Sequence, residues 1–371
     1  MKKAKTMKNY ITHGLLFGAL VLGAGITNAQ DVYLCAEQTT KSLPDGSTVP
    51  MWGYAQDDNA NLSDGCGTGT VQIPGPELTP VGGALTVHLL NNLPEPTSIV
   101  IPGQAMPTSL GGSPTWNDNT TGPRTGPTQR VRSFGAEAAP GSVESYAWTG
   151  LDAGTLMYHS GTHPQKQLYM GLYGAITGDA GVLVDNEIVL FYSEIDPVLN
   201  ASIVDNSYET SIHYHAKWFL VNGEPYVDGV TADIPAGEAG QTTLLRFISA
   251  AGETHVPVLQ GMHMSILAED GSAYSWQDSF GVQTPAPREQ YSVMLPPLKT
   301  KDAIIQPAAG RYAIYDGNGY MTNPSDPADF AKGDSVGGML RFLTVGAGAD
   351  ADGDGIAAVS YTHLTLPTKT E

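Results

Sequence analysis

The chain has 371 residues, a formal net charge of −19, and many glycines (44), prolines (26) and tyrosines (17). Such an acidic surface repels nucleic acid and anionic lipid, which excludes nucleic acid as an expected partner. The glycines and prolines disfavour a helix-rich fold and favour short strands joined by tight turns, over a length that suits two domains.

Residues 1–29 have the order of zones that is typical of a secretory signal peptide. Basic residues come first, an apolar segment runs from Leu15 to Ile26, and small residues end at Ala29. We therefore expect cleavage near Ala29 and a periplasmic or secreted protein. The apolar segment is short and broken by glycine, and no later stretch is long and apolar enough for a membrane span.

An N-terminal arm, residues 30–69, contains the two cysteines of the chain, Cys35 and Cys66. In an oxidising compartment a disulfide between them is the simplest interpretation. Two unpaired thiols are the alternative. Neither cysteine lies near a histidine in the sequence.

A first β-domain is predicted over residues 70–186. Apolar and polar side chains alternate over residues 81–101, with a break in the middle that separates two strands. Residues 102–128 are rich in glycine, proline, threonine and asparagine and predict a surface loop. Strands are expected again at 129–134 and 142–148.

A second β-domain is predicted over residues 187–345, with the boundary near residue 186. The Asn222-Gly223 pair stands between two apolar runs and is a hairpin signal. The strands expected in this domain include 217–226, 242–250, 255–271 and 337–345.

Two C-terminal segments have a different character. Residues 346–358 form an acidic Gly/Asp linker, whose Asp350–Asp354 segment resembles the first half of a calcium loop but lacks the later bidentate carboxylate. Residues 359–371 include a run that resembles a translated sequencing adapter. We expect a non-native tail there, and a natural protein that continues beyond residue 358.

Several stretches resemble segments of the multicopper oxidase family, whose members are built from plastocyanin-like barrels. The first domain contains PGPELTPVGGALTVHLLNNLPEPTSI, similar to the opening of that family's first domain. It also contains GTLMYHSGTHPQKQLYMGLYGAI, similar to the family's Gly-Thr-x-x-Tyr-His-Ser-His segment and the Gly-Leu-x-Gly after it. The second domain contains FLVNGEPY, LLRFISAAGE and GMHMSILAEDG, which resemble strands of the family's middle domain.

This resemblance implies an all-β fold of two tandem Greek-key cupredoxin, or plastocyanin-like, β-barrels or sandwiches. It also implies a copper-binding oxidoreductase. In the family, the first domain gives a trinuclear copper cluster two histidines from a His-Trp-His-Gly strand and two from the His-Ser-His strand. Alternate residues of a strand point to one side, so each His-x-His pair presents two imidazoles together.

The chain departs from both ligand motifs. The segment Val100 to Gly103 stands where His-Trp-His-Gly is expected, and its side chains cannot bind copper. The second pair survives as His159 and His163, with two residues inserted. A turn between them would fold His163 back beside His159, so these two are the predicted metal ligands and copper is the predicted cofactor. The alternative is that His159 is a hydrogen-bonded relic and His163 caps the following turn.

The other histidines cannot complete the family's ligand set. Of the nine in the chain, His13 lies in the leader and His363 in the tail. Neither cysteine lies in a His-Cys-His context, so the electron-entry copper site is absent from the chain as given. The remaining histidines are His88, His159, His163, His213, His215, His255 and His263.

Two further patterns resemble metal sites. The segment His213 to His215 mimics the missing motif, but it runs into the second domain's FLVNG strand, and we interpret it as an exposed decoy. Met262 and Met264 flank His263 and offer soft thioethers to Cu(I). Two methionines on one strand face most simply fill a core.

Three functions remain as alternatives. The first is an exported multicopper-oxidase-like copper-binding oxidoreductase, incomplete or inactive in the chain as given, with any blue copper centre in a lost C-terminal domain. The second is a catalytically inactive cupredoxin-fold binding or structural module, and the third is a periplasmic metal-binding protein. A small molecule or a metal ion is the expected substrate. The sequence assigns neither a catalytic residue nor an oligomeric state.

Overall fold

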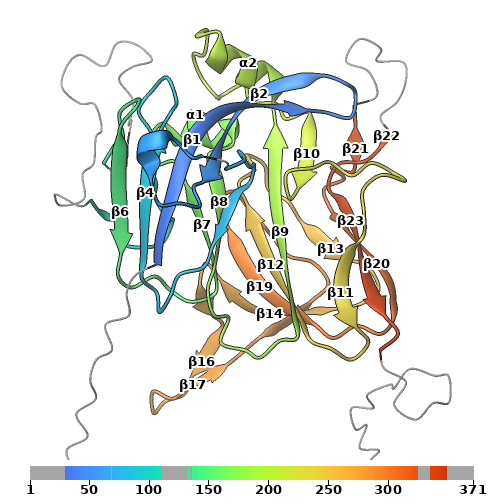
Figure 1. Cartoon of the computed structure of the whole chain (residues 1–371). Coiled ribbons are helices and arrows are strands. Elements are labelled where there is room, and N and C mark those ends of the chain that lie inside the picture. Colours follow the sequence, from blue (N-terminus) through green and yellow to red (C-terminus); the bar gives the residue numbers. More distant parts are fainter. Residues whose placement is uncertain (1–29, 68, 110–132, 134–135, 325–334, 349–371) are drawn as a thin grey trace, which may run out of the picture.

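The computed structural model describes residues 30–67, 69–109, 133, 136–324 and 335–348 (Figure 1). Strands dominate this part of the chain, and none of its helices has the length and apolarity needed to cross a membrane. The predicted signal peptide, calcium-loop segment and adapter-like tail lie outside the described residues, as does most of the loop predicted at 102–128.

The first domain packs two sheets against each other (Figure 1). One has the order β2-β1-β4-β6-β5 and the other the order β3-β8-β7. A single apolar cluster, including Leu34, Tyr54, Val87 and Tyr158, fills the space between them. The strands are β1 (Gln30–Ser42), β2 (Thr48–Gln56), β3 (Gly75–Leu78), β4 (Leu85–Asn91), β5 (Thr108–Ser109), β6 (Val143–Trp148), β7 (Thr155–His159) and β8 (Tyr173–Thr177).

Residues 30–69, which the sequence set apart as an arm, contribute directly to this domain. β1 pairs in parallel with β4, with Val32 opposite Val87, and it pairs antiparallel with β2. The inward side chains of β1 enter the apolar cluster, which fixes the register of the strand. The arm therefore supplies two strands of the first sheet.

The second domain has the same plan. One sheet has the order β10-β9-β12-β19-β14-β15, with β18 beside β14, and the other has the order β11-β23-β20-β13. A second apolar cluster lies between the two sheets. The strands are β9 (Asn186–Ile195), β10 (Trp218–Val221), β11 (Ile234–Glu238), β12 (Thr243–Ser249), β13 (Pro257–Leu259), β14 (Met264–Glu269), β15 (Ser272–Ala273), β18 (Arg288–Gln290), β19 (Thr300–Ile305), β20 (Gly310–Asp316) and β23 (Leu340–Gly346).

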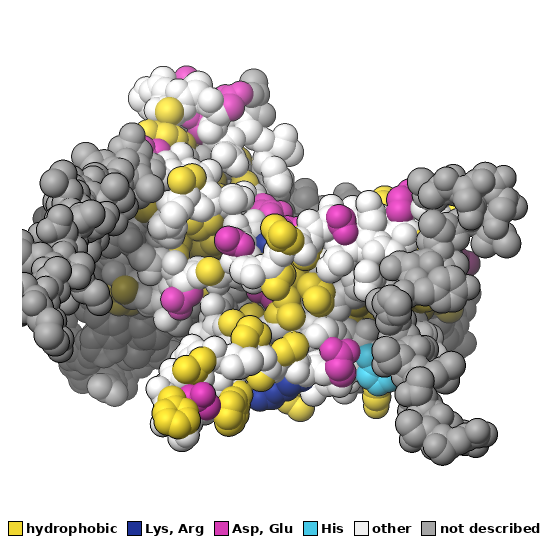
Figure 2. Space-filling view, turned by 90° about the horizontal axis from the view of Figure 1, so that it is seen from below, with side chains coloured by type: hydrophobic (Ala, Val, Ile, Leu, Met, Phe, Trp, Pro, Cys, Tyr) yellow, Lys and Arg dark blue, Asp and Glu magenta, His cyan; other side chains and the backbone are white. Residues whose placement is uncertain are grey.

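The remaining short elements decorate these sheets. β16 and β17 form a hairpin that projects from the bottom of the second domain (Figure 1). On the face seen from below in Figure 2, acidic side chains are spread among hydrophobic and other polar ones. The elements are η1 (Leu62–Asp64), α1 (Pro164–Met170), α2 (Pro197–Val204), β16 (Ser275–Gln277), β17 (Gln283–Pro285), β21 (Thr322–Asn323) and β22 (Ser335–Val336).

β12 explains how the two domains join. All of its side chains are buried, although they alternate between two faces of the sheet. Leu245 and Phe247 enter the core of the second domain, whereas Ile248 packs with Met157 and Tyr173 of the first domain. Its apolar residues therefore occupy both faces of the strand, as in a strand that is covered on both sides, and Arg246 is the charged exception among them.

The predicted Asn222-Gly223 turn is present. Both residues have positive φ values, 54° and 78°, and Val221 and Glu224 exchange backbone hydrogen bonds across the turn. A Cβ atom on Gly223 would lie 2.1 Å from the carbonyl oxygen of Ile73 in the first domain. Glycine is therefore needed here both for the turn and for the approach of the two domains.

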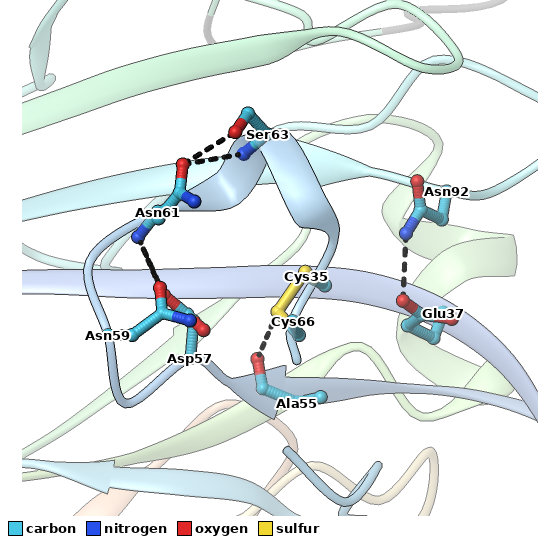
Figure 3. Close-up of a disulfide and its surroundings, with 9 residues drawn as sticks. All are labelled: Cys35, Glu37, Ala55, Asp57, Asn59, Asn61, Ser63, Cys66 and Asn92. Atoms are coloured by element: carbon cyan, nitrogen blue, oxygen red, sulfur yellow. Dashed lines mark hydrogen bonds between the residues drawn. A yellow bond between two sulfur atoms is a disulfide. The ribbon is translucent and has the colours of Figure 1, made fainter. Parts of the chain in front are cut away.

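Cys35 and Cys66 form a disulfide, as the cysteine count predicted (Figure 3). The bond ties the loop that follows β2 onto β1. Short polar residues shape this loop, since the backbone NH of Asn61 donates to Asp57 at 2.9 Å and Ser63 donates to Asn61 at 2.6 Å (Figure 3).

Candidate functional site

His159 is the last residue of β7, and it lies beside the segment from which the first ligand pair is missing. Val100 and His159 exchange backbone hydrogen bonds of 2.9 and 3.0 Å, so the two segments are paired directly. On the other side, His159 pairs with Tyr173 of β8. The fold thus brings together the two stretches that carry ligands in the family, but Val100 presents hydrocarbon.

The imidazole of His159 is 4% exposed and has a defined tautomer. Its Nδ1 lies 2.8 Å from the carbonyl oxygen of Ser160, which can only accept, so Nδ1 donates and the lone pair is on Nε2. Burial lowers the pKa of His159 to about 4, against the opposing hydrogen bond to Ser160. His159 is therefore neutral at physiological pH, with a nitrogen of the kind that binds metals.

His163 occupies the position just before α1. Its backbone is left-handed, with φ at 41°, and its side chain makes no capping hydrogen bond to the helix. Pro164 follows at the first helical position, where a missing NH costs nothing. His163 therefore stands at the N-cap position of α1, as the alternative interpretation expected. Its imidazole, however, makes no capping hydrogen bond.

The inserted residues between the two histidines form a tightly packed turn. A Cβ atom on Gly161 would lie 2.6 Å from Cγ1 of Val100 and 3.0 Å from Oγ of Ser98. Real Cβ atoms do not approach other atoms so closely, so this position accepts glycine alone without local movement. The turn after β7 is thus pressed onto the segment that contains Val100.

A buried network of hydroxyl and amide groups surrounds this turn. Oε1 of Gln167 accepts hydrogen bonds from Thr97 at 2.9 Å and Ser160 at 2.5 Å, and Nε2 of Gln167 donates to Glu95 at 2.7 Å. Thr162 lies 2.9 Å from Ser98 through the two hydroxyl groups. The fully buried members are Thr97, Ser98, Ser133, Ser160, Thr162 and Gln167.

No sequence pattern predicts this network directly, because small polar residues are typical of loops. The available signal was two pairs of hydroxyl residues: Thr97 and Ser98 stand just before the segment at Val100, and Ser160 and Thr162 stand between His159 and His163. Hydroxyl groups that are buried need partners, so two hydroxyl pairs on neighbouring buried segments indicate a shared network.

The residues present do not fit a copper cluster at this position. Among the residues that the structure describes, no three His, Cys, Asp or Glu side chains are grouped so that they could hold a metal ion. Tight copper sites use several nitrogen and sulfur donors, whereas His159 and His163 offer two at most. Copper binding by this pair stays a prediction.

The histidines of the predicted decoy, His213 and His215, are both exposed.

A second cluster of ionisable groups lies in the second domain. The buried His255 lies 2.7 Å from Glu194 through Nε2 and 3.0 Å from Asp316 through Nδ1. Burial opposes the charged form, but hydrogen bonds and charges of Asp316 and Glu194 outweigh it and raise the pKa of His255 to about 9. Imidazolium between two carboxylates is a structural ion triad. No local pattern predicts this triad, since both carboxylates are 61 residues from His255.

The Glu194 carboxylate extends this triad toward the first domain. It accepts hydrogen bonds of 2.9 Å from the hydroxyl of Tyr214 and from the backbone NH of Gly252. The ring of Tyr214 stacks on Tyr169 of α1, with centroids 4.3 Å apart. Within the predicted decoy, His213 to His215, it is therefore the central Tyr214 that makes defined contacts, with Glu194 and Tyr169.

Comparisons with known proteins agree with this architecture. Residues 66–179 match the profile of a family described as multicopper oxidase. A search of curated protein sequences found no match.

Three solved structures illustrate the likeness. A blue copper oxidase from Nitrosomonas europaea has a TM-score of 0.59 at 18% identity and covers 85% of each chain. The multicopper oxidase mgLAC has a TM-score of 0.59 at 18% identity over 90% of this chain and 88% of its own. A copper nitrite reductase from Nitrosomonas europaea has a TM-score of 0.55 at 18% identity over 86% and 95%. At 18% sequence identity, these likenesses show that the chain shares the fold of the three structures.

The prediction of an all-β fold built from cupredoxin domains is confirmed. The family profile covers the stretch that contains Cys66, Val100 and His159. Residues 66–179 therefore resemble the multicopper oxidase family in sequence, and the described residues have the fold of the solved multicopper oxidases.

Proposed function

We propose that the chain is an exported protein of multicopper oxidase fold that works as a binding or structural module and does not reduce dioxygen. One observation carries the proposal. The position at which the family's first domain brings its ligands together holds Val100, which is paired with His159 and packed against Gly161. A packed hydrocarbon contact at this point leaves neither the donors nor the space of a cluster.

The cysteines support the same conclusion. A blue copper centre needs a cysteine thiolate as a ligand. The chain has two cysteines, and both are used in the Cys35–Cys66 disulfide. The sequence as given therefore has no thiolate through which electrons would enter a cluster.

The hydrogen bonds around Gln167 support a structural use of this region. Its amide joins the segment at Glu95 to the turn at Ser160, and the buried hydroxyl groups of Ser98 and Thr162 pair with each other. A satisfied buried network makes a core rigid and specific, whereas an unsatisfied one is costly. The first domain has thus replaced ligand positions with contacts that stabilise one conformation.

A partial copper site at His159 and His163 is the second candidate. The tautomer of His159 favours it, because Nδ1 donates to Ser160 and leaves the Nε2 lone pair for a metal. Its low pKa keeps that nitrogen unprotonated at physiological pH. This reading corresponds to a metal-binding protein or to an incomplete oxidoreductase.

The test is copper loading of the purified protein, followed by metal analysis, visible absorption and dioxygen uptake. His159→Ala and His163→Ala serve as matched variants. We expect no visible copper band, no dioxygen uptake, and the same copper content in the wild type and both variants. Copper that is lost with either substitution would establish the second candidate, and a visible band with dioxygen uptake would overturn the proposal.

Export rests on the order of zones in residues 1–29 and on the disulfide, which forms in oxidising compartments. The N-terminal sequence of the protein recovered from its host measures it directly. We expect the mature chain to begin at Gln30. A recovered protein that still begins at Met1 would contradict export by this leader.

A further inference from the structure

The loop that follows β2 carries an oxygen-bearing side chain at every second position. In the stretch DDNANLSDGCG, residues 57–67, these positions hold Asp57, Asn59, Asn61 and Ser63. Calcium loops of the EF-hand type take ligands from positions 1, 3, 5 and 7. The stretch also contains three aspartates and no lysine or arginine, so it is locally acidic. Such spacing also occurs in plain surface turns, so the evidence for a site has to come from the geometry of Asp57.

Asp57 has one carboxylate oxygen with a partner and one without. Oδ2 accepts a hydrogen bond of 2.9 Å from the backbone NH of Asn61. Oδ1 is buried and has no hydrogen-bond partner among the described residues, and the residue as a whole is 4% exposed. A buried carboxylate oxygen is normally hydrogen-bonded or bound to a cation, so the lack of a partner indicates a ligand of positive charge.

The side chains of Asp57 and Asn59 converge (Figure 3). The backbone NH of Asn61 donates to Oδ2 of Asp57 and, at 2.8 Å, to Oδ1 of Asn59, so both oxygens lie around one nitrogen atom. A Cβ atom built on Gly67 would lie 3.5 Å from Oδ1 of Asp57 and 3.7 Å from the amide nitrogen of Asn59. One point beside Gly67 is thus faced by the carboxylate oxygen that lacks a partner and by an amide group.

This point also has room for an ion. Apart from the chain neighbours of Gly67, no third atom of the described residues lies within 4 Å of that Cβ position. A calcium ion lies about 2.3–2.6 Å from its oxygen ligands, closer than a hydrogen-bonded water, so an oxygen that is closed to water still reaches such an ion. Rotation of the Asn59 amide would turn its oxygen toward the point, and the NH of Asn61 would keep Oδ2 of Asp57 as its acceptor.

We propose that this loop binds one calcium ion through Oδ1 of Asp57 and the side chain of Asn59. Carboxylate and amide oxygens are the ligands that calcium prefers, whereas copper and zinc prefer nitrogen and sulfur. The Cys35–Cys66 disulfide fixes the end of the loop to β1, so part of the order that binding requires is already present. Calcium takes about six to eight oxygen ligands, and water and backbone carbonyl groups supply the rest.

The affinity should be modest. The twelfth position of the loop, where an EF-hand has a bidentate glutamate, holds Thr68 in the sequence. We therefore expect a Kd of about 0.1–1 mM, the range of extracellular calcium modules. The site goes beyond the proposed function, because it uses neither His159 nor His163 and its test leaves the copper experiment unchanged.

The experiment is a calorimetric titration of the chelator-stripped, disulfide-intact protein with Ca²⁺. Excess Mg²⁺ is present throughout, so that loose attraction of cations to the acidic surface is suppressed. We expect one equivalent to bind. Asp57→Asn should weaken binding by at least about tenfold, because it removes the charge of the ligand and keeps an acceptor for the NH of Asn61. Asn59→Ala should weaken it as well.

Asp58→Asn is the matched control, because it removes the same charge from an exposed neighbour and leaves Oδ1 of Asp57 in place. One equivalent that is lost with Asp57→Asn and Asn59→Ala, and retained with Asp58→Asn, supports the site. Absence of binding in the presence of magnesium overturns it, and so does binding that Asp57→Asn leaves unchanged. Equal losses in Asp57→Asn and Asp58→Asn overturn it too, because they indicate diffuse attraction to the surface.

Two measurements keep the comparison valid. Circular dichroism and a count of free thiols show whether each variant is folded with its disulfide formed. Asn59 is exposed, so Asn59→Ala tests the site even if Asp57→Asn does not fold. Wild-type affinity in a folded Asn59→Ala would then overturn the proposal.

Discussion

Arg246 of β12 donates a hydrogen bond of 2.9 Å from Nη1 to the hydroxyl of Thr155 in β7, and this contact joins the two domains. The same guanidinium donates to Gly178 and to Glu187 at 2.9 Å. Asp302 of β19 accepts from the backbone NH and the hydroxyl of Thr155. Burial raises the pKa of Asp302, although the Thr155 hydrogen bonds and the charge of Arg246 lower it.

Removal of this guanidinium should weaken the whole protein. Arg246→Met keeps much of the length of the side chain, but it leaves the Gly178 carbonyl without its Arg246 hydrogen bond and the buried Asp302 without its neighbouring cation, which costs about 3–5 kcal/mol. Unfolding by urea, followed by tryptophan fluorescence, measures the loss. Arg311→Met is the control, since Arg311 forms an exposed ion pair with Asp233 and its removal should change stability little. Equal losses in the two variants would show that Arg246 is not a domain anchor.

The triad at His255 predicts a loss of stability in alkali. The pKa of the His255 imidazole is about 9 in the folded protein and 6.5 in an unfolded chain. The triad's contribution to the free energy of unfolding is therefore fully present below pH 6.5. It declines as the pH rises through 9, by about 3 kcal/mol at most. Urea midpoints between pH 6 and 10 should fall for the wild type. In His255→Gln, which does not titrate, the midpoints should start lower and follow a flatter course, and parallel curves would refute the prediction.

Local patterns in the sequence predicted the elements that local chemistry determines. The alternating and continuous apolar runs located β4, β6, β12 and β23, and the Asn222-Gly223 pair located its turn. The resemblance located His159 at the end of a buried strand. These features depend on residues that are close in the chain, so the sequence displays them directly.

Contacts between distant residues were beyond the same reasoning. β1 joins the first sheet by parallel pairing with β4, and no local pattern shows which strand an N-terminal segment will choose. The network around Gln167 joins residues from positions 95 to 167, and its members looked like ordinary loop residues.

The low pKa of His159 predicts a separate loss of stability in acid. Burial places the folded pKa at about 4, below the unfolded value of 6.5, so protonation is disfavoured in the folded state. The stability from neutral His159 is present above pH 6.5 and is lost as the pH falls toward 4. Carboxylates titrate in the same range, so the measurement is the difference between the wild type and His159→Gln. That difference should shrink on acidification, and a constant difference would contradict the assignment.

The disulfide should stabilise the first domain by closing a loop. The two cysteines are 31 residues apart, and a cross-link of that length stabilises by about 3–4 kcal/mol in a chain-entropy treatment. A reducing agent should therefore lower the urea midpoint of the wild type. The Cys35→Ala/Cys66→Ala double variant should show the lower midpoint with or without reductant. A wild-type midpoint that is insensitive to full reduction would mean that the bond contributes nothing.

The contact between Gly161 and Val100 gives the sharpest test of a packed ligand position. A methyl group at Gly161 would lie 2.6 Å from Cγ1 of Val100 and 3.3 Å from its Cγ2, so Gly161→Ala should destabilise the protein by about 1–3 kcal/mol through overpacking. Val100→Ala removes both methyl groups and should destabilise it through a cavity. In the double variant each change relieves the other, so its loss should be smaller than the sum of the two, with a coupling of about 0.5–3 kcal/mol. Additive losses would mean that the turn after β7 does not press on Val100, and the region would then have room that a metal and its ligands require.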